Sequence, residues 1–358
     1  LAGGGATQLA MSADDQLTLN FTNLTADATK LTEISQLVAA NGVKSLTSDT
    51  GTSVTLDASQ AATVGAISDS SNKIALNFTL SNQANIAQAS ALVGNTTGTV
   101  AFHSTGISND IAAYVNADPA SSSVSAISTE FSAIRAADSD VNVTVSGFTS
   151  PATAAEMDAI NLIAAKTAGL VTATFTASAA NVGRLDSSTW TTNGGTAGSD
   201  VLTVTVNDAM SVSQFTDLDA LTNQSIIMSI GITDSLSAIN DGSLTSGILA
   251  AIDDDDDITI TLNDTKIEST DFAKVNALAN ATGFTGGVVA TVEGTAANLA
   301  GGNLNNLASA TDNLTITVSD NPTVAELKTI SDRTSASNIT VTGSITGALA
   351  DFIKTDGS

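Results

Sequence analysis

Five consecutive aspartates, Asp253 to Asp257, are the residues of this chain whose type and spacing most directly suggest chemistry. Hard divalent cations such as Ca²⁺ take several carboxylate oxygens, so the run is a candidate calcium site formed by Asp253, Asp254, Asp255, Asp256 and Asp257. The run has neither the glycine nor the bidentate glutamate of an EF-hand loop. The alternative interpretation is a solvated acidic turn that precedes the strand beginning at Ile258.

Other chemistry-bearing residues are few. The chain has no cysteine, which excludes disulfides, thiolate metal sites and cysteine nucleophiles. Its one histidine, His103, is not accompanied by a Gly-x-Ser-x-Gly nucleophile elbow, and we expect it at an outward-facing strand position. Trp190 is a candidate ligand-contact residue, with a buried anchor for the loop after it as the alternative. We therefore assign no catalytic residue, and Ca²⁺ is the one cofactor considered.

The charge balance limits the partners. The chain of 358 residues carries 36 acidic and 11 basic residues, a formal net charge of −25. Nucleic-acid binding needs clustered lysine and arginine, and the cations here fall singly. No apolar run approaches the ~20 residues of a membrane span. We expect no nucleic-acid partner and no membrane insertion; the expected partners are further copies of the chain and a cell-envelope polysaccharide.

An internal repeat must position these residues. Six Thr-rich strand patterns recur about 57 residues apart, a spacing typical of repeat architectures. They begin near residues 17, 74, 141, 201, 257 and 314. Each copy contains a strand, a turn, a helix, a second strand and a short return, a pattern that favours parallel strands. The predicted fold is α/β, an elongated solenoid of about twelve strand-plus-helix/loop coils with a parallel β-sheet on one side. We expect residues 1–358 to form one continuous solenoid and to be part of a longer chain.

Helix starts can be predicted from cap residues. The sequence predicts caps at Thr149–Pro151, at Ser211 or Ser213, at Ser269–Asp271 and at Ser319–Pro322. Apolar stripes follow at helical spacing, as in Met157, Ile160 and Ile163.

Three segments carry a resemblance: Gly294–Leu299, Ala154–Ile160 and Val275–Leu278. Their alternating patterns resemble the tandem α/β repeats of giant secreted cell-surface proteins of marine cyanobacteria and similar bacteria. The resemblance implies an extracellular or cell-surface location, high acidity and a structural or adhesive role, with no catalytic residues. The function we expect is a non-enzymatic structural protein that forms a surface layer, fibre or filament. A phage tail-fibre protein and a secreted polysaccharide-acting enzyme on a β-solenoid are the alternatives.

Overall fold

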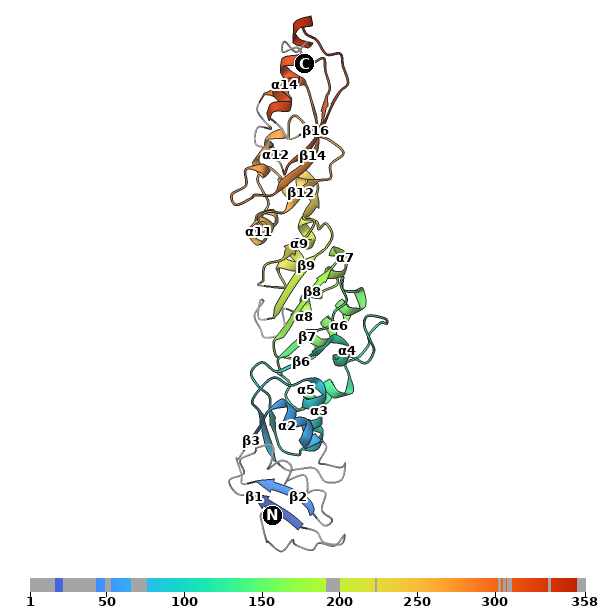
Figure 1. The fold of residues 1–358 in the computed structure, drawn as a ribbon, viewed down its shortest axis with the longest axis vertical. Coiled ribbons are helices and arrows are strands. Elements are labelled where there is room, and N and C mark those ends of the chain that lie inside the picture. The colour runs from blue at the N-terminus through green and yellow to red at the C-terminus, as the bar shows by residue number, and fades with distance from the viewer. Residues whose placement is uncertain are drawn as a thin grey trace. The chain divides into compact units, whose positions relative to one another are not determined.

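The computed structural model describes residues 17–21, 43–48, 53–65, 76–190, 200–222, 224–301, 304, 307, 311–333 and 336–352. The chain divides into two compact units. The first unit holds residues 1–175, 184–202 and 221–223, and the second holds residues 176–183, 203–220 and 224–358. Within each unit, short strands alternate with short helices in the order shown in Figure 1. The copy start near residue 74 lies outside the described residues.

The elements up to residue 190 are eight strands and seven helices of the described chain. The strands are β1 (Leu17–Phe21), β2 (Val43–Ser48), β3 (Ser53–Leu56), β4 (Asn77–Leu80), β5 (Val100–Ala101), β6 (Ile107–Asp110), β7 (Val143–Ser146) and β8 (Val171–Ala177). The helices are α2 (Ala58–Gly65), α3 (Ile86–Asn95), α4 (Ile111–Tyr114), α5 (Thr129–Ala137), α6 (Ala154–Ala164), α7 (Ala179–Val182) and α8 (Ser187–Trp190).

The elements from residue 200 onward follow the same alternation. The strands are β9 (Val201–Val206), β10 (Ile227–Met228), β11 (Ile232–Asp234), β12 (Thr259–Leu262), β13 (Ile267–Glu268), β14 (Gly287–Gly294), β15 (Asn313–Val318) and β16 (Ala336–Val341). The helices are α9 (Val212–Asp219), α10 (Leu236–Ile239), α11 (Ser246–Asp254), α12 (Phe272–Ala279), α13 (Ala296–Ala300), α14 (Val324–Arg333) and the 3-10 turn η1 (Leu349–Phe352).

The predicted α/β class with parallel strands is confirmed, and the single continuous sheet is wrong. The described strands form separate sheets in the orders β1–β2, β3–β4–β5, β6–β7–β8–β9–β10 and β11–β12–β14–β15–β16. Each strand pair with a described register is parallel. Two of the interruptions follow strands of two residues, β5 and β10, which are too short to extend a ladder on both sides. A positive-φ glycine comes directly before the next strand at both places, Gly106 at φ 66° and Gly231 at φ 92°.

These two glycines also reveal a longer repeat than the sequence pattern indicates. The order β6, α4, α5, β7, α6, β8, α7 recurs as β11, α10, α11, β12, α12, β14, α13, with the two-residue strand β13 added between β12 and α12. A Cβ atom at Gly106 would lie 1.8 Å from the carbonyl oxygen of Asn142, and one at Gly231 would lie 2.0 Å from that of Thr259. Only glycine tolerates both this backbone conformation and this close approach. The structural repeat therefore spans about two of the 57-residue copies.

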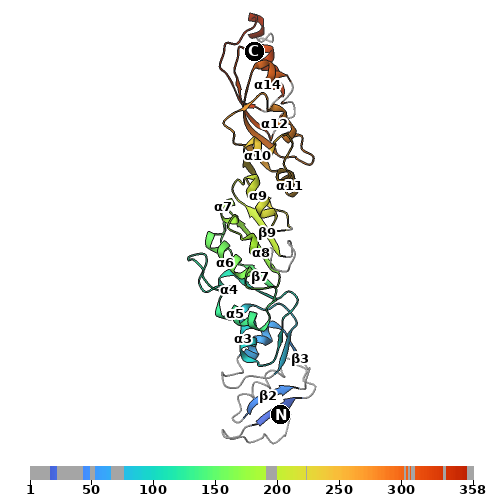
Figure 2. The same cartoon turned by 180° about the vertical axis from the view of Figure 1, so that it is seen from behind.

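The core is formed by one face of each strand and one stripe of each helix. In β9, Leu202, Val204 and Val206 are buried while the threonines between them are partly exposed, as strand alternation requires. The stripe predicted for the third copy is confirmed, because Met157, Ile160 and Ile163 of α6 are buried. Each such aliphatic side chain contributes about 1.5–3 kcal/mol on burial. In the second unit, α12 and α14 lie along one side of the strands (Figures 1 and 2).

Helix caps lie close to the predicted positions, with two corrections. Ser211 caps α9 as predicted. The cap of α6 is Thr153, whose Oγ1 accepts from the Glu156 amide at 3.2 Å, so the start predicted at Thr149–Pro151 is too early. Ser319–Pro322 does not cap α14. Thr323 does, since its Oγ1 accepts from the Glu326 amide at 3.2 Å. Asp271 precedes α12 without a side-chain cap hydrogen bond.

Candidate functional site

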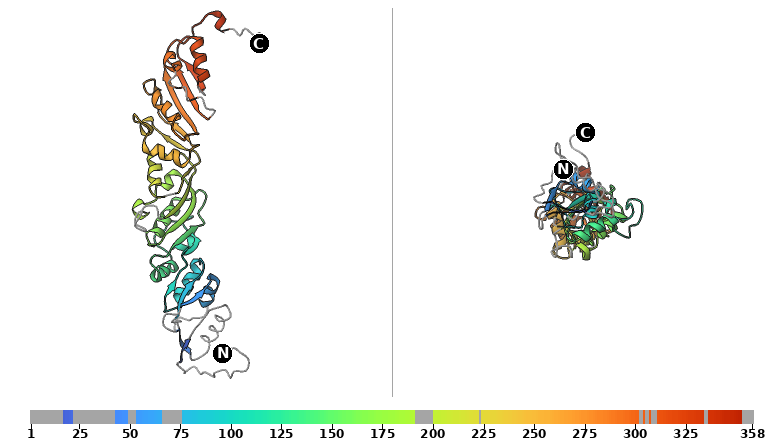
Figure 3. Two further views of the ribbon diagram at one scale, coloured as in Figure 1. Left: turned by 90° about the vertical axis from the view of Figure 1, so that its left-hand side faces the viewer. Right: turned by 90° about the horizontal axis from the view of Figure 1, so that it is seen from below.

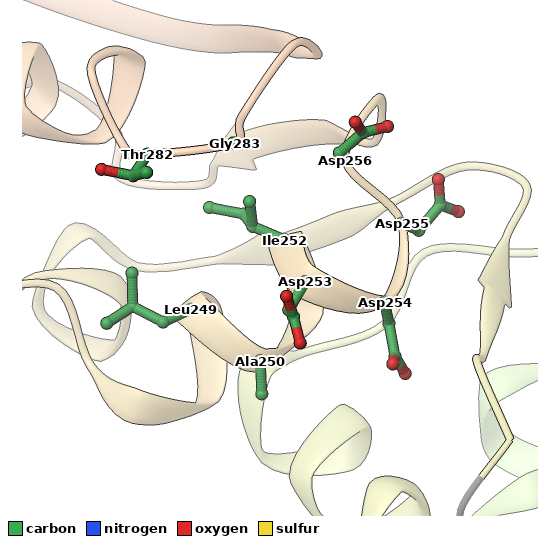
Figure 4. A pocket seen from close by; sticks show the side chains of 9 residues that line it. All are labelled: Leu249, Ala250, Ile252, Asp253, Asp254, Asp255, Asp256, Thr282 and Gly283. Atoms are coloured by element: carbon green, nitrogen blue, oxygen red, sulfur yellow. The ribbon is translucent and has the colours of Figure 1, made fainter.

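The aspartate run lies in the second unit, at the C-terminal end of α11. Asp253 and Asp254 are its last residues, Asp255 is its C-cap, and Asp256 and Asp257 lead into β12. The first four line a hollow of about 760 Å³ together with Leu249, Ala250, Ile252, Thr282 and Gly283 (Figure 4). The hollow is therefore apolar on the helix side and acidic at the helix end.

Figure 4 shows the carboxylates of Asp253 and Asp254 on one side of the turn and those of Asp255 and Asp256 on the other, so these four do not converge on a common centre. Asp254 Oδ2 accepts a hydrogen bond from the Ile226 amide at 3.1 Å, and Asp255 Oδ2 accepts one from the Met228 amide at 3.1 Å. Across the described part of the chain, no group of three or more His, Cys, Asp or Glu residues is placed to hold a metal ion. Calcium binding by Asp253–Asp257 stays a prediction. It can be checked by measuring whether millimolar Ca²⁺ changes the melting temperature of the protein.

The local electrostatics raise the pKa values of several of these carboxyls above their ordinary value. Burial raises the pKa of Asp254, and the negative charge of Asp253 raises it further. The hydrogen bond from the Ile226 amide lowers it in part. Burial also raises the pKa of Asp255, assisted by its neighbour Asp257. Asp219 on α9 has its pKa raised by burial and by the charge of Asp254. Mutual repulsion of close carboxylates is the common physical cause beside burial.

Asp254 belongs to a larger set of side chains that we call coil-bridging acceptors. These are Asp and Asn residues whose side-chain oxygen accepts a hydrogen bond from a backbone amide in the preceding coil, 22 to 29 residues earlier. One group accepts from the first residue of a helix, at 2.5 to 3.1 Å. The pairs are Ala58 with Asn82, Ala179 with Asp208, Val212 with Asp234, Leu236 with Asp264 and Ala296 with Asp320.

A second group of coil-bridging acceptors serves the start of a strand. The pairs are Val171 with Asp200, Ile226 with Asp254, Met228 with Asp255 and Val288 with Asp312, at 2.8 to 3.1 Å. Asp200 is 2% exposed and Asp312 is 7% exposed. A buried amide without an acceptor costs about 1–3 kcal/mol. By accepting hydrogen bonds from these amides, the carboxylates avoid that cost and stabilise the contact between one coil and the next.

The first group solves a problem that every helix has at its start. The first amides of a helix have no partner within the helix, and negative charge is favourable there. In α13, Asp320 of the following coil accepts from the first amide, of Ala296, at 2.8 Å, while Thr295 Oγ1 accepts from the third, of Asn298, at 3.3 Å. The five helices of this group, α2, α7, α9, α10 and α13, are thus capped partly by the turn before them and partly by the following coil.

Sequence reasoning missed this role, although a signal for it exists. Asn82, Asp208, Asp264 and Asp320 all stand two residues after the last residue of a strand. The preceding residue, as in Ser319, donates its amide to the last carbonyl of the previous strand, here Gly294, at 2.9 Å. The recurrence of an acidic or amide residue at this position is visible in the sequence once the strands are aligned.

Trp190 is 3% exposed and ends α8 in the first unit. Its Nε1 donates to Asn161 Oδ1 at 2.9 Å, and the same oxygen accepts from the Asp186 amide at 3.0 Å. Asn161 Nδ2 donates to the Arg184 carbonyl at 2.7 Å, so one side chain of α6 holds the segment before the tryptophan. These contacts are those of a buried anchor. The ligand-contact role of Trp190 stays a prediction, and the loop at 191–199 lies outside the described residues.

His103 lies in the turn after β5, beyond the end of the strand at Ala101. Its Nδ1 is 2.8 Å from Thr105 Oγ1. The strand predicted around His103 is therefore shorter than expected. The turn leads through Gly106 to β6, and its hydrogen bonds support that change of direction.

The solvent side of the sheets carries short hydroxyl side chains. Register pairs place Ser108, Thr144 and Thr172 in one row across β6, β7 and β8 of the first unit. In the second unit Thr291 of β14 pairs with Thr315 of β15, which pairs with Asn338 of β16. Figure 3 (left) shows these strands of the second unit, in orange and red, beside α14. The sheets are thus aliphatic toward the helices and mostly polar toward solvent, with a few charged residues such as Asp110 of β6 and Glu293 of β14 on that side.

No protein-family model matches the chain, and no curated protein matches its sequence. Within the described residues, none of the helices has the length and apolar character needed to cross a membrane.

Proposed function

We propose that this chain is a non-enzymatic extracellular structural protein that forms part of a surface layer, fibre or filament by packing of its repeats and by association with further copies. We also propose that its coils continue as one α/β solenoid of about twelve coils.

The observation that carries this proposal is the set of coil-bridging acceptors. Nine Asp or Asn side chains in two groups bind backbone amides of the preceding coil, and of these Asp254 and Asp255 also line the hollow at the end of α11. In repeat proteins, stability is a sum of terms within repeats and between neighbours. A chain whose acidic residues form hydrogen bonds between neighbouring coils is suited to stacking its repeats into one continuous structure.

The solvent-facing composition supports the same role. The chain carries a net charge of −25, which favours solubility of a secreted repeat protein and disfavours non-specific association. Specific association of copies then requires a defined surface of low charge.

Two measurements test the proposal. Small-angle scattering reports the radius of gyration, for which a compact globule of this length gives about 21 Å. A continuous solenoid predicts a clearly larger value, and a value near that of the globule would contradict it. Negative-stain electron microscopy of the concentrated protein reports assembly, for which we expect ordered filaments or layers. Dispersed single particles at every concentration would contradict the assembly role.

A further inference from the structure

The second unit presents a surface of mostly short uncharged side chains, which we call the hydroxyl face. It is the solvent side of the sheet β11–β12–β14–β15–β16, and its rows follow from the parallel register. Its members are partly or fully exposed. They are Thr233, Thr259, Thr261, Val289, Thr291, Asn313, Thr315, Thr317, Asn338 and Thr340.

The hydroxyl face differs in charge from the rest of the chain. Among the described residues, its charged side chains lie at one margin, where Lys266 Nζ is 2.8 Å from Glu268 Oε1 and 3.3 Å from Glu293 Oε1. These three groups sum to a charge of −1, whereas the chain carries −25. The remaining acidic residues of the second unit lie on helices, turns and strand ends, as the aspartates of α11 do.

We propose that the hydroxyl face is the contact surface for a second copy of this chain, an inference that rests on the structural role proposed above. Two copies repel each other wherever their acidic surfaces meet, so they approach at the lowest cost through this face. Both copies also carry the same strand repeat of about 4.8 Å. The register of the strands forms the rows Thr233–Thr261–Val289–Asn313, Thr291–Thr315–Asn338 and, at the margin, Glu293–Thr317–Thr340. Threonine is small enough for two sheets to pack face to face at about 10 Å.

The composition of the hydroxyl face favours a protein partner over a glycan. Sugar rings are usually bound by stacking on aromatic side chains, and none of the ten members of the face is aromatic. β-Branched residues pack well on a pleated surface, and cross-strand Thr–Thr pairs stabilise sheets. A second sheet therefore complements this surface better than a sugar chain does.

The size of the hydroxyl face sets the strength of the contact. Five strands about 4.8 Å apart, with roughly four residues of about 3.3 Å along each, cover roughly 300 Å². Stable interfaces bury about 800 Å² on each partner, so one such contact gives weak and reversible association. Copies held side by side in an array reach the local concentration at which weak contacts persist.

The test places a charge at Thr315, which is exposed in an inner strand of the sheet. T315E is compared with the wild type and with the matched control S331E, which adds the same charge at an exposed position of α14. Sedimentation equilibrium over a range of concentrations reports the weight-average mass. We expect the mass of the wild type and of S331E to rise with concentration, and that of T315E to stay monomeric. Raising the salt concentration should strengthen wild-type association, because salt screens the net repulsion.

A cross-linking variant keeps the test independent of charge and of folding. The chain has no cysteine, so T315C and S331C each introduce a single thiol. A short bismaleimide should cross-link T315C into dimers far more efficiently than S331C, with circular dichroism confirming that both fold.

The outcomes separate the two proposals. If the wild type assembles and T315E assembles equally well, the hydroxyl face is not the contact, while the structural role stands. If the wild type stays monomeric and forms no filaments or layers, both fail. If the wild type stays monomeric but binds insoluble cellulose and T315E does not, the face binds a neutral glycan and the proposed second copy is wrong.

Discussion

Replacing Asp320 by alanine removes the acceptor for the first amide of α13, and it tests the coil-bridging role directly. Asp320 Oδ1 lies 2.8 Å from the Ala296 nitrogen, and the carboxylate is partly buried. Loss of a helix cap costs about 0.5–2 kcal/mol. Since 0.5–2 kcal/mol changes an equilibrium about 2- to 30-fold, local opening at the start of α13 should become more frequent by that factor.

Amide hydrogen exchange measured by NMR reads out this opening at single residues. In D320A we expect faster exchange at Ala296 and its neighbours in α13, with α14 unchanged. D320N keeps an acceptor oxygen and should lose only part of the protection. T323A is the reciprocal control, because Thr323 caps α14 through the Glu326 amide and should affect that helix alone.

Comparison of D320A with T323A can refute the coil-bridging role of Asp320. If D320A exposes the amides of α14 and leaves α13 protected, Asp320 acts on its own coil, as the sequence pattern at Ser319–Pro322 had suggested. If neither helix changes, the hydrogen bond to Ala296 contributes nothing measurable and the coil-bridging acceptors lose their energetic role.

Three further predictions concern backbone, protonation and burial. G231A should lower the free energy of unfolding, measured in urea, by at least about 3 kcal/mol, because its Cβ would meet the Thr259 carbonyl. G283A should lower it by only about 1 kcal/mol, because Gly283 also has a positive φ, 86°, but no atom lies near its Cβ position. Equal losses in the two variants would contradict the close approach of Gly231 to Thr259. Burial and the side-chain hydrogen bond with Asp140 raise the pKa of Asp138 to about 6. The folded state therefore favours the protonated carboxyl, and its stabilising contribution is complete below the ordinary pKa and lost as the pH rises through about 6. D138N should accordingly be more stable than the wild type at pH ~7.5 and about equal to it near pH ~3. A difference independent of pH would contradict this assignment. Trp190, 3% exposed, should emit at short wavelength and resist acrylamide quenching, whereas a red-shifted, freely quenched emission would place it in solvent.

The regular elements were largely predictable because their signals are local. The alternation in Leu202–Val206, Ile258–Leu262 and Leu314–Val318 locates β9, β12 and β15 to within a residue at each end. Burial of one face and exposure of the other produce this pattern whatever the partner strand is. The helix stripes follow for the same reason.

The contacts between coils were not predictable at the same level. Asp320 looks like a cap for the helix that follows it, because cap rules consider only neighbours in sequence. Its actual partner, Ala296, lies 24 residues earlier and becomes a neighbour only when the coils stack. Two interruptions of the sheet coincide with Gly106 and Gly231, whose positive φ is a property of the folded backbone. The aspartate run was visible in the sequence, but the directions of the Asp254 and Asp255 carboxylates depend on Ile226 and Met228 in the preceding coil.

Immunoelectron microscopy of native material, with an antibody raised against this chain, tests the central proposal most directly. A structural role in a surface layer, fibre or filament predicts label along ordered structures attached to the cell surface, with a regular spacing. Label that is diffuse in the medium, with no ordered structure beneath it, would contradict that role.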